Sequence, residues 1–75
     1  MAVLELTLGN HIMLQRRKLG MTQTDLAHKS GVVYATISRL ENDRGPQPNR
    51  ATLIALAYAL QIDPEELLAY LRGGE

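Results

Sequence analysis

Apolar residues recur at steps of three and four along most of the chain, which is the spacing of amphipathic helices. In the first such segment, residues 8–20, Leu8, Ile12 and Leu19 fall near one helix face. Thr7 can cap its amino end and Gly20 can end it. The pattern predicts a first helix that turns this face toward a core.

A second helix is predicted from the N-cap Thr22 to Gly31, and a third over residues 34–42. Their inward positions are Leu26 and Ala27 in the second helix, and Ile37 and Leu40 in the third. The two helices are separated by about three residues, so they must cross steeply, and Ala27 is small enough for the close approach. Gly31 reverses the chain there.

Two further helices are predicted after the loop DRGPQPN, whose prolines and glycine exclude regular structure. Asn49 can cap the fourth, in which Leu53, Leu56, Ala57 and Leu60 keep the helical spacing. Before the fifth, Asp63, Pro64 and Glu66 occupy cap, first and third positions, the pattern of a capping box. The prediction is one all-α domain with a five-helix core over residues 8–71 and a tail at residues 72–75. Residues 1–7 are expected to form a tail or a short strand.

The block MTQTDLAHKSGVVYATISRLEN, extended by LQRRKLG before it and TLIALAYALQIDPEELL after it, resembles the phage repressor and Cro-like helix-turn-helix family. Characteristic places of that family are matched by Gln23, Ala27, Gly31, Ile37, Leu40, Glu41 and Asn42. The resemblance implies a lambda-repressor-like fold with the helix-turn-helix at the second and third helices. It also implies a dimeric regulator of transcription that binds double-stranded DNA at an inverted-repeat operator.

Carried over residue by residue, the resemblance implies that the third helix reads bases in the major groove. Its exposed residues are Tyr34, Ala35, Ser38 and Arg39. Arg39 is the strongest candidate, because a guanidinium can bond guanine O6 and N7 together. Ser38 and Ala35 carry less information, Tyr34 could reach a phosphate instead, and a solvated Arg39 is the alternative.

The resemblance also implies phosphate contacts by Gln23, at the start of the second helix, and by Asn42, Arg44 and Arg50 around the following loop. Idle surface charge is the alternative for the latter three. Arg16 and Glu41 match a family pair that ties the first helix to the end of the third, which is a structural role. Two departures weaken the match: Val33 replaces a capping Ser or Thr, and Asp43 stands where glycine often follows Glu-Asn and brings negative charge toward DNA.

Composition changes this picture in one respect. A chain of 75 residues, 45% apolar with no Phe or Trp, builds only a thin core. The fifth helix carries more apolar surface than such a core is expected to absorb, so Leu67, Leu68, Tyr70 and Leu71 are predicted to form a homodimer interface or a docking face for another protein. The formal net charge of zero neither favours nor excludes a polyanion partner.

Other functions find less support. His11 and His28 lie on different predicted helices without a third ligand at metal spacing, so no enzyme, metal site or cofactor is expected. The alternative to a DNA-binding regulator is an antitoxin or adaptor that binds a partner through the fifth helix. Asp25 could face RNA polymerase in an activator, although a solvated Asp is the simpler interpretation. The absence of cysteine and of a visible export signal or membrane span favours a cytoplasmic protein.

Overall fold

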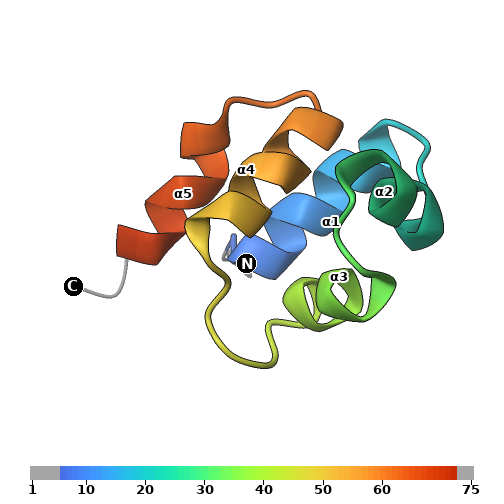
Figure 1. Ribbon diagram of the computed structural model, residues 1–75. Coiled ribbons are helices and arrows are strands. Elements are labelled where there is room, and N and C mark those ends of the chain that lie inside the picture. The colour runs from blue at the N-terminus through green and yellow to red at the C-terminus, as the bar shows by residue number, and fades with distance from the viewer. Residues whose placement is uncertain (1–5, 73–75) are drawn as a thin grey trace, which may run out of the picture.

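The computed structural model describes residues 6–72 of the chain, and this part contains five helices and no strand (Figure 1). Residues 1–5, most of the segment that is expected to form a tail or a short strand, lie outside it. The helices are α1 (Leu8–Lys18), α2 (Gln23–Ser30), α3 (Tyr34–Glu41), α4 (Arg50–Ala59) and α5 (Pro64–Arg72). Helix α4 lies between α5 on one side and the α2–α3 pair on the other, while α1 packs against both α3 and α5.

Three helix starts follow from side chains that accept backbone hydrogen bonds. Thr7 Oγ1 accepts from the amide of Asn10 at 3.1 Å, and Asn49 Oδ1 accepts from the amide of Thr52 at 2.8 Å. Thr22 Oγ1 accepts from the amide of Asp25 at 3.0 Å. The predicted caps of α1, α2 and α4 are therefore confirmed.

The capping box predicted at the start of α5 is wrong. Asp63 Oδ1 accepts from the amide of Glu65 at 2.9 Å, but the Glu66 carboxylate lies 3.2 Å from Nε2 of His11 instead of returning to the cap. A reciprocal box forms at α2, where the amide of Thr22 also donates to Asp25 Oδ2 at 2.9 Å. The Glu66 carboxylate thus contacts His11 on α1 in place of the backbone amide of Asp63.

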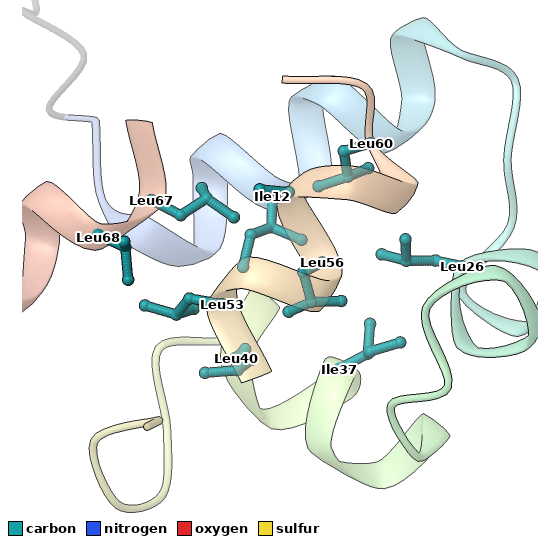
Figure 2. Packing of buried hydrophobic residues seen from close by; sticks show 10 residues of the cluster. Ile12, Leu26, Ile37, Leu40, Leu53, Leu56, Leu60, Leu67 and Leu68 are labelled. Atoms are coloured by element: carbon teal, nitrogen blue, oxygen red, sulfur yellow. The ribbon is translucent and has the colours of Figure 1, made fainter. Parts of the chain in front are cut away.

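One apolar core joins all five helices (Figure 2). Its fully enclosed large side chains are Ile12, Leu26, Ile37, Leu53, Leu56, Leu60 and Leu67. The inward faces predicted for α2, α3 and α4 are confirmed, with Ala27 and Val32 partly buried against this cluster. Leu19 is an exception, because it lies at the C-cap of α1 and stays 36% exposed.

Two places in the fold depend on glycine. Gly31 takes a left-handed conformation with φ of 78°, which ends α2 and lets α3 begin three residues later. Gly9, near the start of α1, lies against the end of α3: an added Cβ would overlap the carbonyl oxygen of Leu40 and lie 2.7 Å from that of Glu41. The backbones of α1 and α3 can approach this closely only because Gly9 has no side chain.

Candidate nucleic-acid interface

The outer face of α3 is the surface on which the predicted base-reading residues gather. Tyr34 is 52% exposed, Ala35 and Arg39 are exposed, and Ser38 is half-buried. The opposite face buries Ile37 and Leu40 in the core. Helix α3 forms one edge of the molecule (Figure 1), so its outer face is open to a large partner.

The start of α3 is unusual because it lacks a side-chain cap, as the sequence predicts. Val33 occupies the N-cap, and its side chain cannot accept a hydrogen bond. It is 67% exposed beside Tyr34, so the amino end of α3 presents two adjacent apolar or aromatic groups to solvent. This end can therefore make apolar contact with a thymine methyl group.

Arg16 and Glu41 form the ion pair that joins α1 to the last residue of α3. Arg16 Nε donates to Glu41 Oε2 at 2.7 Å, and Nη2 donates to Oε1 at 2.8 Å. Arg16 Nη1 also donates to the carbonyl oxygen of Met21 at 2.9 Å. Hydrogen bonding to Glu41 raises the pKa of the Arg16 guanidinium, and burial opposes this rise. Both side chains are buried, so the pair fixes the direction of α3 relative to α1.

Gln23 joins this pair rather than standing free at the start of α2. Its Nε2 donates to Glu41 Oε1 at 3.0 Å, and its side chain is half-buried. The contact holds the side chain of Gln23 at the first turn of its own helix, α2. Unpaired backbone amides and the helix dipole favour an anion there. Within residues 6–71, every buried side-chain nitrogen and oxygen has a hydrogen-bond partner.

A polar hollow of about 560 Å³ opens beside Gln23, between the end of α1, the start of α2 and α3. Its walls include Arg17, Tyr34 and Asn42. The sequence analysis does not predict a DNA contact for Arg17, although two successive arginines lie in the last turn of α1 and only Arg16 has the inward position. The helical spacing could have identified Arg17 as the exposed member of this pair.

A smaller hollow of about 200 Å³ lies between the end of α3, the following loop and the start of α4. Arg39 and Arg44 line it, and Arg50 lies exposed in the first turn of α4. Asn42 Nδ2 donates to the carbonyl oxygen of Ser38 at 2.8 Å, which directs one amide hydrogen back onto α3. The structure thus brings Arg39 and Arg44 together in one hollow, whereas Gln23 and Asn42 line the other and Arg50 lines neither.

The two acidic residues near this surface are engaged in capping. Asp25 belongs to the capping box of α2, and its hydrogen bonds with Thr22 lower the pKa of its carboxyl group. The Asp43 carboxylate is turned onto the start of α1, where it accepts from Thr7 Oγ1 at 2.7 Å and from the amide of Gly9 at 3.0 Å. This second role was not predicted, because residues 34 and 36 positions apart form it.

The predicted interface on α5 needs a correction. Leu67 and Leu68 are 0% and 4% exposed inside the core, so the expectation that the core could not absorb them is wrong. Leu71 is half-buried, and the Tyr70 hydroxyl lies 2.9 Å from Nδ1 of His11. Burial, assisted by the negative charge of Glu66, raises the pKa of Tyr70. Tyr70 and Leu71 line an apolar groove of about 530 Å³ between α5, the start of α1 and the α3–α4 loop.

Two general features bear on function. Among residues 6–72, no group of three or more His, Asp or Glu side chains is placed to hold a metal ion. Each helix of this segment is too short or too polar to cross a membrane.

The fold and the exposed α3 define a class of protein. A helix-turn-helix family model matches residues 12–67, and the chain belongs to this helix-turn-helix family. Its α2–α3 unit is the helix-turn-helix of a lambda-repressor-like fold.

Three relatives come from Bacillus subtilis (strain 168). The chain is 42% identical over 65 residues to the HTH-type transcriptional repressor RghR, covering 87% of this chain and 47% of RghR. It is 38% identical over 61 residues to the uncharacterized HTH-type transcriptional regulator RghRB, covering 81% of this chain and 44% of the relative. It is 34% identical over 59 residues to the uncharacterized HTH-type transcriptional regulator YozG, covering 79% of this chain and 68% of YozG. The chain therefore spans about half the length of the first two relatives.

Proposed function

We propose that the protein is a sequence-specific regulator of transcription, acting as a repressor or autoregulator, that inserts α3 into the major groove of double-stranded DNA. The observation that carries the proposal is the division of α3 into a buried face and an exposed face. Ile37 and Leu40 hold the helix on the core, while Tyr34, Ala35 and Arg39 face solvent. A rigidly held helix with a free outer face at the edge of the molecule is what groove reading requires.

Base reading rests chiefly on Arg39. Its guanidinium can bond both acceptors of a guanine, a contact that discriminates against the wrong base by about 1–3 kcal/mol. Ala35 can contact a thymine methyl group, and Ser38 can bond several bases. Tyr34, at the solvent-exposed amino end of α3, reaches either a base edge or a phosphate, and the adjacent Val33 can make apolar contact with thymine.

Phosphate contacts would fix the register of α3 in the groove. Gln23 and the first turn of α2 form one phosphate contact point. The exposed Arg17, which lines the same hollow, belongs to this contact point. Asn42, Arg44 and Arg50 form a second contact point after α3. Because the formal net charge is zero, binding depends on this local distribution of charge.

We also propose that the protein dimerises on an inverted repeat. The contact surface on α5 is smaller than the one predicted from the sequence. Leu67 and Leu68 are excluded by their burial, which leaves Tyr70 and Leu71 on the wall of the apolar groove. Leu8 and Pro48 extend this groove beyond α5. An antitoxin or adaptor that binds a partner protein through the same groove is the second candidate, and its support is the apolar lining.

Selection of bound fragments from random duplex DNA at about 0.15 M salt tests the proposal, because nonspecific binding is weak there. We expect an inverted repeat with half-site centres about 10 bp apart, or a multiple of that spacing. Arg39→Ala should change the selected sequence, whereas Tyr58→Ala, at an exposed position on α4, should leave it unchanged. If the folded protein enriches no sequence, DNA reading by α3 is refuted and the partner-binding alternative takes its place.

A further inference from the structure

The α3–α4 corner, defined as residues 42–45, has a fixed conformation built from two left-handed residues. Asp43 has φ of 54° and Gly45 has φ of 81°. The amide of Asp43 donates to the carbonyl oxygen of Leu40 at 3.0 Å, and the amide of Arg44 donates to that of Arg39 at 2.8 Å. These bonds fold the corner back onto the last turn of α3.

The Asp43 side chain joins this corner to α1. Its Oδ2 accepts from Thr7 Oγ1 at 2.7 Å, and its Oδ1 accepts from the amide of Gly9 at 3.0 Å. A carboxylate at this place also interacts favourably with the positive end of the α1 dipole. A side chain at residue 9 would separate the two elements, so the bond depends on the closeness that Gly9 allows.

The same corner lies against the side chain of Arg39. A Cβ placed on Gly45 would be 3.4 Å from Cδ and 3.8 Å from Cβ of Arg39, so residue 45 lies beside the aliphatic part of this side chain. Arg39 and Arg44 line one hollow beside the corner. The corner that Asp43 joins to α1 is therefore also the corner that bonds to the backbone of Arg39 and lies beside its side chain.

We propose that Asp43 is a positioning residue for base recognition: by holding the α3–α4 corner on α1, it fixes the direction of the Arg39 side chain. This inference rests on the proposed function. Asp43 acts through Arg39 and does not touch DNA. Its negative charge is compatible with a DNA-binding surface because the carboxylate is directed to Thr7 and Gly9.

Asp43→Gly is the informative variant. Glycine adopts the positive φ of residue 43 readily, so the corner keeps its backbone conformation while the bonds to α1 are lost. We expect the ratio of affinities for the selected operator and for an operator changed at the base pair read by Arg39 to fall about three- to tenfold. Asp63→Gly is the matched control, because it removes a capping carboxylate from α5, and it should leave the ratio unchanged.

A double-variant cycle separates positioning from a general structural role. In the Arg39→Ala background, Asp43→Gly should cause no further loss of discrimination, since the side chain that it positions is gone. Asp43→Asn, whose amide oxygen can still accept from Gly9, should retain most of the ratio.

Several outcomes would overturn the inference. Equal weakening on both operators, an unchanged ratio in Asp43→Gly, or a further loss in the Arg39→Ala background would each show that Asp43 does not act through Arg39. These results differ from failure of the proposed function, in which the unaltered protein itself would show no base preference.

Discussion

Arg16 and Glu41 are joined by two hydrogen bonds, of 2.7 and 2.8 Å, between side chains that are buried under the helix-turn-helix unit. The carboxylate also accepts from Gln23, so one oxygen of Glu41 serves two donors from different helices. The end of α3, the end of α1 and the start of α2 therefore meet at one carboxylate. The orientation of the proposed reading helix depends on this junction.

Removing one partner of the pair should be costly. Glu41→Ala leaves the Arg16 guanidinium buried without its counter-ion, and we expect the free energy of unfolding to fall by about 3–5 kcal/mol. Arg16→Ala should have a similar effect. The double variant Arg16→Met/Glu41→Leu should lose much less, because no charge remains buried. Urea unfolding of the three variants measures this, and single variants that lose less than the double variant would contradict the prediction.

Gly9→Ala should destabilise the protein, against the usual trend in helices. Glycine to alanine in a helix interior normally gains about 0.5–1 kcal/mol. Here the added methyl group meets the backbone of α3, so we expect a loss of about 1–3 kcal/mol, as for other overpacked sites. Asn10→Ala, one residue further along α1, is the control and should have a small effect. A stabilised Gly9→Ala protein would show that α1 and α3 can separate freely.

The capping carboxylate of Asp25 should make stability depend on pH in the acid range. Hydrogen bonds from Thr22 lower the folded-state pKa of Asp25 below its unfolded value of about 3.9. Its contribution is therefore complete above this unfolded value and is lost as the pH falls through the folded pKa. Thermal unfolding should show a higher Tm for the unaltered protein than for Asp25→Ala at pH 7. The difference should shrink at pH 3 and below, and a constant difference would exclude the carboxylate as its source.

Gln23 should affect DNA affinity without changing base preference. Gln23→Ala removes the proposed phosphate contact but leaves both Arg16–Glu41 hydrogen bonds in place, so we expect about equal weakening on specific and nonspecific DNA. Gln23→Glu should weaken binding more and also lower stability, because it places a second carboxylate next to Glu41. Titrations on the selected operator and on a scrambled duplex measure the effect. A changed base preference would assign Gln23 to base contact instead.

The helices and most of their caps could be predicted because their signals are local. Thr7, Thr22 and Asn49 each lie three residues before the amide that they accept from. Gly31 was predictable because its left-handed conformation is one that few other residues take. The joint pattern of the α2–α3 unit also fixed which face of α3 would be exposed.

Features that depend on distant residues were not predictable. Nothing near Asp43 indicates that its carboxylate reaches α1, and nothing near Glu66 indicates that His11 competes for it. Leu67 and Leu68 were assigned to an interface because composition alone underestimates what five helices can bury. Gly9 is different, because an isolated glycine within a helical pattern is a local sign of close packing, and here the backbone of α3 lies against it.

The contacts of α1 have a consequence for the order of folding. Its side chains bond to residues that follow much later in the chain: Arg16 to Glu41, Gln15 to the carbonyl oxygen of Leu60, and His11 to Tyr70. During synthesis, α1 leaves the ribosome before the other four helices and acquires these partners as they emerge. Its hydrogen bond to Tyr70, 59 positions away, forms only after α5 has emerged. Helix α1, the first of the five helices to be made, therefore acquires this tertiary contact only when the last of them is present.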